Sequence, residues 1–164
     1  PTKAWILLLG DRAKMFLQES AYLWPCWHDQ FSISEAGLDE IVKVLMTMRE
    51  GPRLMVIKTF TNSWCTSRRL HEGGSSPTIH PCFFCGEVRK DDLAHYLECD
   101  SLWSTVISAA NLGAEFLDLD PISRAGLSNP SRASYNLIAC AFLVYHAIKL
   151  EHLEESLNAI ATND

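Results

Sequence analysis

Three cysteines and one histidine near the middle of the chain have the types and the spacing of a metal site. Cys82 and Cys85 are three positions apart, and further along His95 and Cys99 are four positions apart. A tight Cys-x-x-Cys turn delivers two thiolates to a tetrahedral zinc ion, and residues at i and i+4 face the same side of a helix. The spacing therefore predicts one zinc ion bound by these four side chains. Because protein fills all four positions, we expect a structural rather than a catalytic zinc.

The residues around the four ligands fit this interpretation. Gly86 follows the second cysteine and is free to take the backbone angles that point amide groups at the sulfurs. Asp91 and Asp92 precede the histidine, where carboxylates favour a helix N-terminus. Arg89 and Lys90 could offset the single negative formal charge of three thiolates, one neutral imidazole and a zinc ion.

Two alternatives to this site stay open at the level of sequence. His80, two residues before Cys82, could replace His95, but the helical pairing with Cys99 would then be lost. The six cysteines could also form three disulfides in a secreted protein, although a chain of 164 residues with 48% apolar residues does not need such bridges. Their clustered spacing favours metal over disulfides, and with it a reducing intracellular compartment.

The other cysteines and histidines show no ligand-like spacing. Cys65 and Cys140 are expected to be buried thiols that act as small hydrophobes, and Cys26 has no assigned role. The remaining histidines are expected to be surface residues or hydrogen-bonded core residues: His28, His71, His146 and His152.

Composition and periodicity predict a globular, mostly α-helical fold in which a helical domain carries a small zinc-knuckle insert. Apolar residues recur at helical spacing, and no stretch shows the strict alternation of a half-buried strand. We expect an N-terminal helical part over residues 1 to 71, a loop and zinc knuckle over 72 to 100, and a C-terminal helical part over 101 to 164. Helices are predicted over residues 3 to 22, 35 to 48, 52 to 70, 102 to 112 and 130 to 159.

The predicted helices have expected start and stop signals. Ser34 is expected to cap the second helix, whose apolar stripe consists of Leu38, Ile41, Val42, Leu45 and Met48. Gly113 is expected to end the helix from residue 102, and Asn129 with Pro130 to begin the last one. Asp118 and Asp120 are interpreted as a solvated loop.

The ends and the charge of the chain limit its environment. The apolar run from residue 137 to 148 is too short for the roughly 20 residues that span a bilayer, so we expect no membrane-spanning segment. The apolar stretch near the start is too short for the core of a signal peptide. Because the chain begins at Pro1, we expect a fragment or a processed product. Its formal net charge of −6 opposes broad attraction to a polyphosphate.

Residues 58 to 103, KTFTNSWCTSRRLHEGGSSPTIHPCFFCGEVRKDDLAHYLECDSLW, resemble a region of the reverse transcriptases of non-LTR (LINE-like) retrotransposons. In that family, a helix ending in a Trp, Thr, Ser and Arg cluster follows the polymerase core and precedes a Cys-x-x-Cys…His-x-x-x-Cys element. The likeness extends to about residue 153 through the apolar helix with its Tyr-His pair. It implies zinc on Cys82, Cys85, His95 and Cys99, and binding of template RNA or target DNA.

Two functions from different classes follow. As a nucleic-acid-binding module, the chain would hold Arg68, Arg69, Arg89 and Lys90 near one surface to contact phosphates. As a structural subunit or scaffold derived from a mobile element, it would bind protein partners in a larger assembly and no nucleic acid. No polymerase, hydrolase or phosphate-loop motif is present in the sequence, so we expect neither catalysis nor a small-molecule substrate.

Overall fold

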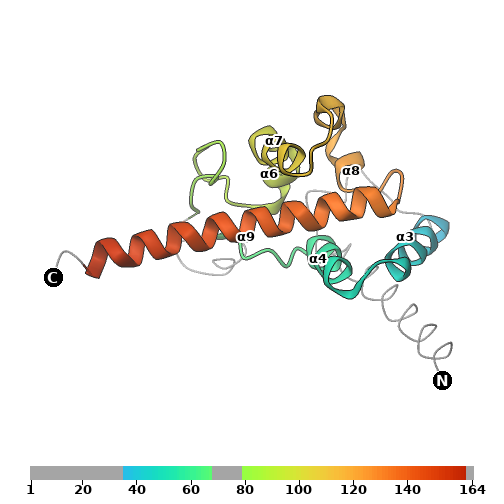
Figure 1. Ribbon diagram of the computed structural model, residues 1–164, viewed down its shortest axis with the longest axis horizontal. Helices are drawn as coiled ribbons and strands as arrows, with labels where there is room; N and C mark the ends of the chain where they lie inside the picture. The colour runs from blue at the N-terminus through green and yellow to red at the C-terminus, as the bar shows by residue number, and fades with distance from the viewer. Residues whose placement is uncertain (1–34, 68–78, 162–164) are drawn as a thin grey trace, which may run out of the picture. The chain divides into compact units, whose positions relative to one another are not determined.

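A computed structural model describes residues 35 to 67 and 79 to 161 of the chain. These residues are helical and include no strand, which confirms the mostly α-helical prediction (Figure 1). The helix predicted over residues 3 to 22 lies outside the described residues. The described helices are α3 (Glu35–Thr47), α4 (Glu50–Phe60), α6 (Leu93–Glu98), α7 (Asp100–Ala109), the short 3-10 helix η1 (Ala114–Asp118), α8 (Pro121–Arg124) and α9 (Arg132–Ala161).

The chain divides into two compact units, and α9 contributes to both. The first unit comprises Pro1–Trp64 and Leu119–Ala139, and the second comprises Cys65–Asp118 and Cys140–Asp164. The boundaries predicted from sequence at residues 71 and 100 stay a prediction.

The first unit has an apolar core. The five apolar residues predicted as a stripe on α3 are all buried, which confirms that prediction. The rings of Phe60 on α4 and Tyr135 on α9 meet edge to face, with centroids 5.6 Å apart. The buried apolar residues of this unit are Leu38, Ile41, Val42, Leu45, Met48, Val56, Phe60, Trp64, Ala125, Leu127, Tyr135, Leu137, Ile138 and Ala139.

Helix α4 ends ten residues earlier than the sequence pattern predicts. It stops at Phe60, and Asn62 follows in the left-handed region with φ of 49°. The Ser63 amide donates to the Lys58 carbonyl at 2.6 Å and the Asn62 amide to the Thr59 carbonyl at 3.1 Å, which is the pattern of a Schellman motif. The prediction that this helix runs on to residue 70 is therefore wrong, because the motif uses the carbonyls that a further turn would need.

Trp64, which the sequence pattern placed inside that helix, lies after it. Its indole N–H donates to the Thr59 hydroxyl at 2.9 Å, and its side chain is buried. Leu54, assigned to the same apolar face, is 51% exposed. The chain therefore turns back on the end of α4 instead of extending it.

Serine and aspartate caps start the last two helices of the first unit. Asp120 caps α8 by accepting from the Ile122 and Ser123 amides at 3.0 and 3.1 Å, so it has a structural role that the solvated-loop interpretation omitted. Ser131 accepts from the Ser134 amide at 3.1 Å, and α9 begins at Arg132. The predicted start at Asn129 and Pro130 is therefore displaced by two residues.

The second unit is built from α6, α7, η1 and the C-terminal part of α9. Figure 1 shows α6 and α7 on the same side of α9, and the rings of Tyr96 on α6 and Tyr145 on α9 lie 4.8 Å apart. The Trp103 indole of α7 donates to the Leu97 carbonyl of α6 at 3.1 Å. Helix α7 ends in a second Schellman motif at Asn111, φ 53°, and not at the predicted Gly113.

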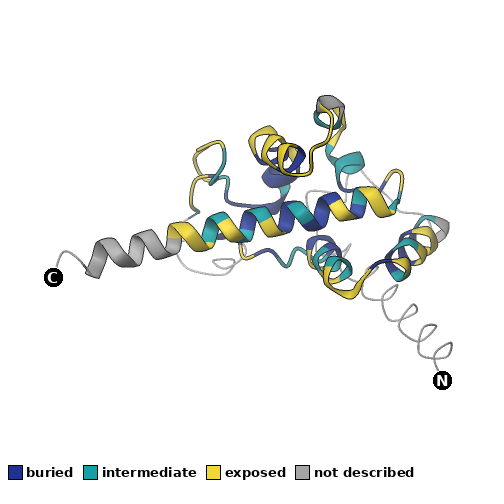
Figure 2. Ribbon diagram, in the orientation of Figure 1, coloured by how far each residue is buried: buried dark blue, intermediate teal, exposed yellow. Residues whose placement is uncertain are grey.

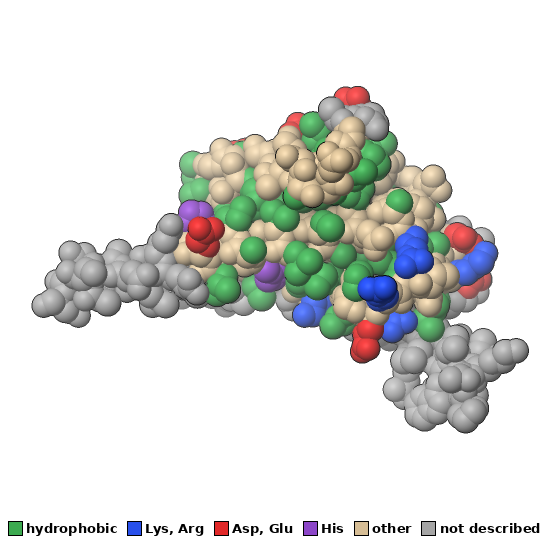
Figure 3. Space-filling view, viewed as in Figure 1, with side chains coloured by type: hydrophobic (Ala, Val, Ile, Leu, Met, Phe, Trp, Pro, Cys, Tyr) green, Lys and Arg blue, Asp and Glu red, His purple; other side chains and the backbone are tan. Residues whose placement is uncertain are grey.

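Helix α9 is the longest described helix, and buried and exposed residues alternate along it as far as His152 (Figure 2). Leu137 and Phe142 on this helix are buried, each being 8% exposed. Its segment Arg132–His152 is long and apolar enough to cross a membrane by length and composition alone, and Figure 3 shows apolar side chains along the helix. Core helices of soluble proteins share both properties, so the expectation of no membrane-spanning segment stays a prediction.

Candidate metal site

The two cysteines of the first ligand pair lie on a tight turn. The Gly86 amide donates to the Cys82 carbonyl at 3.0 Å, and the Cys82 amide donates to the Glu87 carbonyl at 2.9 Å. Gly86 has φ of 73°, which a residue with a side chain rarely adopts. The Phe84 amide points at the Cys82 sulfur at 3.4 Å. The turn is therefore the knuckle that the Cys-x-x-Cys spacing predicts, with an amide aimed at a ligand sulfur.

The second pair lies on and just after α6. Asp92 caps this helix by accepting from the His95 amide at 2.8 Å, as expected of a carboxylate at a helix N-terminus. The helix ends at Glu98, and Cys99 has an extended backbone with φ of −69° and ψ of 99°. The two ligands therefore do not share one helix as the i and i+4 argument assumed. They nevertheless face the same point.

The four side chains converge with the separations of a tetrahedral site. The ligand atoms of Cys82, Cys85, His95 and Cys99 all lie within 4.8 Å of one another. The sulfurs of Cys82 and Cys99 are 3.7 Å apart, and the Cys85 sulfur is 3.3 Å from His95 Nε2. A tetrahedron with metal bonds of about 2.3 Å to sulfur and 2.0 to 2.1 Å to nitrogen has edges of about 3.5 to 3.8 Å. The donor set and its geometry fit a metal ion.

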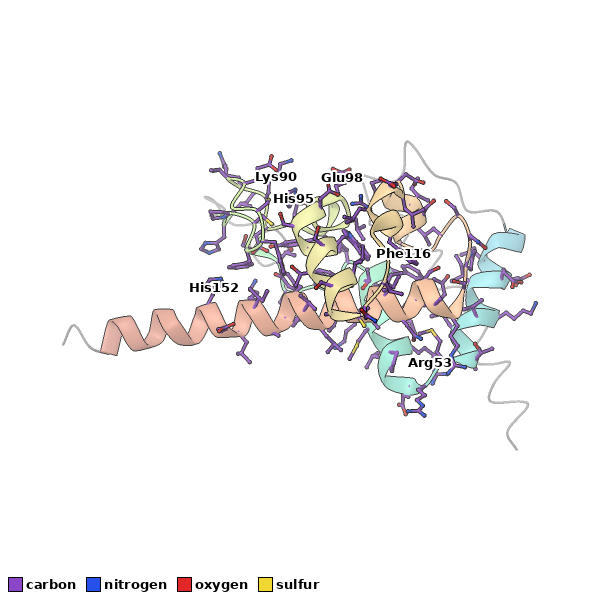
Figure 4. All side chains as sticks on the ribbon, turned by 45° about the horizontal axis from the view of Figure 1, so that its top comes forward. Arg53, Lys90, His95, Glu98, Phe116 and His152 are labelled. Carbon is purple, nitrogen blue, oxygen red and sulfur yellow. The ribbon has the colours of Figure 1, made fainter. Side chains whose placement is uncertain are left out.

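The imidazole of His95 is oriented for this role. Its Nε2 faces the Cys85 sulfur, while its Nδ1 lies 3.7 Å from a carboxylate oxygen of Glu87. A carboxylate beside the second ring nitrogen favours a proton there and leaves the first nitrogen free to bind metal. In Figure 4, His95 lies beside the loop that carries Lys90.

Burial affects the metal-free thiols. Cys82 and Cys99 are 3% and 4% exposed, while the Cys85 side chain is exposed. Burial raises the pKa of the Cys99 thiol to about 12, and it also raises the pKa of Cys82 above its ordinary value. A metal ion must displace the protons of these thiols when it binds, because the thiolate is the ligand.

The structure separates the four ligands from the alternatives. His80 does not belong to the converging group, and its side chain is exposed. Its backbone has another role, since its amide donates to the Ser67 hydroxyl at 2.9 Å and its carbonyl accepts from the Asp91 amide at 3.0 Å. No disulfide joins cysteines within the described residues.

The predictions for the other cysteines and histidines have mixed outcomes. The prediction of a buried Cys65 is wrong, because this residue is exposed, and its carbonyl accepts from the Tyr145 hydroxyl at 3.1 Å. Cys140 is partly buried. His146 Nδ1 lies 2.8 Å from the Phe142 carbonyl, as expected of a hydrogen-bonded histidine. The predictions for Cys26, His28 and His71 lie outside the described residues.

The basic residues predicted to bind nucleic acid are only partly described. Arg89 is exposed, with φ of 59°, and Lys90 beside it is partly buried. Arg68 and Arg69 lie outside the described residues. The second unit as a whole carries five Lys or Arg and twelve Asp or Glu, a formal net charge of −7.

The structure also gathers residues that no sequence pattern connects. The Asp91 carboxylate has no exposed surface and accepts from the Ser67 amide at 2.7 Å and from the Tyr96 hydroxyl at 2.9 Å. The Tyr145 hydroxyl lies 3.1 Å and the Lys149 ammonium 3.6 Å from the same carboxylate. Burial and the Asp91 charge raise the pKa of both tyrosines, so both keep their protons and can donate. The only sequence signal for this cluster was that two aspartates stand side by side. Asp92 alone is enough to cap α6, which leaves Asp91 without a local role.

Comparison of the chain with protein-family models, with curated proteins and with solved structures finds no match in any of the three.

Proposed function

We propose that the chain is a non-catalytic zinc-binding structural module of a protein resembling the reverse transcriptases of non-LTR retrotransposons. The observation that carries this proposal is the convergence of Cys82, Cys85, His95 and Cys99 within 4.8 Å. Three sulfurs and one imidazole nitrogen form a borderline-soft, tetrahedral donor set, and zinc is the metal that most commonly occupies such a set in proteins.

The closed donor set supports a structural and not a catalytic role. With four protein ligands, a zinc ion has no position left for an activated water or for a substrate atom. The ligands come from a knuckle and from the end of a six-residue helix, and neither element is long enough to be stable alone. The module therefore uses the metal to order residues 80 to 103.

Metal analysis of the reduced chain tests this function. We expect one zinc ion per chain, lost in Cys99→Ser, and faster proteolysis of that variant between residues 80 and 103 only. Cys65→Ser is the matched control, because this exposed thiol is not among the ligands, and it should retain the metal. A purified, reduced chain without metal, or a Cys99→Ser chain that retains it, would contradict the proposal.

Contact with RNA or DNA is a second candidate function, favoured by the exposure of Arg89 beside the knuckle. The charge of −7 on the same unit opposes it, so binding would be weak and salt-dependent. Replacing Arg68 and Arg69 by Ala, or Arg89 by Ala, should flatten the slope of log K against log salt by about 0.7 to 0.9 per lost phosphate contact. Arg49→Ala, on an exposed residue of the first unit, is the control.

The same titration decides between this candidate and the scaffold role. Absence of binding to either nucleic acid at about 10 to 20 mM salt, where attraction to phosphate is strongest, would remove the second candidate. The zinc module would then serve as a scaffold for protein partners.

A further inference from the structure

The buried carboxylate of Asp91 joins three segments that are distant in sequence. Ser67 lies 24 residues before it, and Tyr145 lies 54 residues after it. Tyr96 belongs to α6, while Tyr145 and Lys149 belong to α9. The two tyrosines are fully buried, and their rings lie 4.8 Å apart. Both carboxylate oxygens are thus used, one by the two hydroxyls and the other by the Ser67 amide and the lysine.

Both ligand pairs of the metal site are tied to this point. On the side of the knuckle, His80 lies two residues before Cys82. Its backbone carbonyl accepts from the Asp91 amide, and its backbone amide donates to the Ser67 hydroxyl. On the side of α6, the next residue, Asp92, caps the helix by accepting from the His95 amide. The relative position of the two ligand pairs therefore depends on where the Asp91 carboxylate is anchored.

The knuckle also touches α9 directly. Phe83, between the two knuckle cysteines, stacks on His152 with ring centroids 5.4 Å apart. Lys149 Nζ lies 5.7 Å from the centre of the same ring. Lys149 further donates to the Cys65 carbonyl and, at 3.2 Å, to the Tyr145 hydroxyl. The contacts on α9 thus span residues 145 to 152, about two helical turns.

A buried carboxylate makes these contacts depend on one another. If the carboxylate lost its donors, an unpaired charge would be left in an apolar interior. The free-energy cost of such a charge is far larger than the contribution of any single exposed hydrogen bond. If α9 moved away, Asp91 would lose Tyr145 and Lys149 together. The segment that carries the ligands would then lose its anchor.

We propose that Asp91 is a positioning residue of the metal site and that its contacts with Tyr145 and Lys149 couple metal binding to the docking of α9 in the second unit. This inference rests on the proposed function, because it assumes that the four ligands bind zinc. Linkage is reciprocal, so α9 docked on Asp91 strengthens zinc binding, and bound zinc holds α9 in place to the same extent.

The test compares two tyrosines on the same helix. Tyr145→Phe keeps the ring and removes the hydroxyl, which lies 3.1 Å from Asp91 and 3.1 Å from the Cys65 carbonyl. Tyr135→Phe is the matched control, because Tyr135 is also fully buried on α9 but its hydroxyl has no hydrogen-bond partner among the described residues. We expect Tyr145→Phe to weaken zinc binding about 5- to 10-fold in a competition titration with a chromophoric chelator, and Tyr135→Phe to leave it unchanged within a factor of two.

Hydrogen exchange supplies the reciprocal measurement. Zinc should slow exchange of the amides of residues 140 to 152 in the parent chain and in Tyr135→Phe, and it should slow them less in Tyr145→Phe. Circular dichroism of each zinc-loaded variant shows whether it keeps the helix content of the parent chain, so a general loss of stability is separated from a loss of coupling. Asp91→Asn, which keeps the shape but removes the charge, should weaken zinc binding more than Tyr145→Phe does.

The outcomes separate the inference from the function on which it rests. A parent chain that binds no zinc would contradict the proposed function itself. A parent chain that binds zinc, with Tyr145→Phe binding it as tightly and showing the same zinc-dependent protection of α9, would overturn the coupling and leave the zinc module intact.

Discussion

The interiors of the two units differ in how many polar side chains they bury. Among the described residues, the first unit buries one polar side chain, Thr59, within an otherwise apolar core. The second buries five: Thr66, Ser67, Asp91, Asp92 and His95. Two of its buried apolar residues, Cys82 and Cys99, are candidate metal ligands. A polar interior is stable only when every group has its partner, so the second unit depends on specific bonds in addition to the packed apolar area that both units have.

The two units also differ in net charge. The first unit carries nine Lys or Arg and eight Asp or Glu, a formal net charge of +1, whereas the second carries −7. Mutual repulsion within the second unit opposes its folding, and a bound divalent cation would offset part of it. The comparison supports our proposal that a metal ion stabilises the second unit, which contains the four candidate ligands.

Removing the metal should have the largest effect and should fall on one unit. Apparent binding free energies of structural zinc are about 10 to 16 kcal/mol near neutral pH, and this energy is also folding energy. We expect a strong chelator in reducing buffer to abolish the exchange protection of α6, while α3 and α4 keep theirs. If both units lost their exchange protection equally, or if neither lost it, the proposed difference between the units would be contradicted.

Truncating a core phenylalanine should come next in size. Phe60→Ala in the first unit and Phe142→Ala in the second each remove a buried ring and should cost about 3 to 5 kcal/mol in denaturant unfolding. Because none of the four candidate ligands belongs to the first unit, the cost of Phe60→Ala should be the same with and without metal. A metal-dependent cost for Phe60→Ala would show that the two cores do not act separately.

Gly126→Ala should have a smaller effect confined to the first unit. Gly126 has φ of 65°, and a Cβ there would lie 2.8 Å from Cε1 of Tyr135, so the substitution should cost about 1 to 3 kcal/mol. Gly51→Ala is the control, since a Cβ there meets no atom within 4 Å and the residue lies in the first turn of α4. Thermal unfolding of both variants measures the difference, and equal midpoints would contradict the packing described for Tyr135.

The smallest effect should come from Asp120. Hydrogen bonds from the Ser123 hydroxyl, the Ser123 amide and the Ile122 amide lower the pKa of this carboxyl below its ordinary value. Its contribution is therefore present above the ordinary pKa of Asp, about 3.9, and is lost as the pH falls through the lower folded value. Asp120→Ala should cost about 0.5 to 1 kcal/mol at neutral pH and progressively less as the pH falls below about 3.9. A cost that stays constant as the carboxyl is protonated would show that Asp120 does not act as a charged cap.

Local patterns in the sequence were sufficient to predict several parts of this structure. The apolar stripe of α3 repeats at helical spacing, and a knuckle of two cysteines needs only the turn between them. The Asp92 cap also depends on residues within one helical turn. In each case the partners are near neighbours in the chain.

Features that depend on distant partners were not predicted. Asp91 looks like its neighbour Asp92 in sequence, and only donors from residues 67, 96, 145 and 149 distinguish it as a buried anchor. Helix α4 stops at Phe60 because Asn62 takes a left-handed conformation, which asparagine adopts in some contexts and not in others. Cys65 is exposed, although its carbonyl accepts a hydrogen bond from the Tyr145 hydroxyl 80 residues later, a contact that no local pattern predicts.

X-ray absorption at the zinc edge of the reduced, purified chain tests the central claim most directly. It reports the identity and distance of the atoms bound to the metal without assuming which residues supply them. The account predicts three sulfurs at about 2.3 Å and one nitrogen at about 2.0 to 2.1 Å, with one sulfur lost in Cys99→Ser. A shell of oxygen atoms, or one with fewer than three sulfurs in the parent chain, would contradict it.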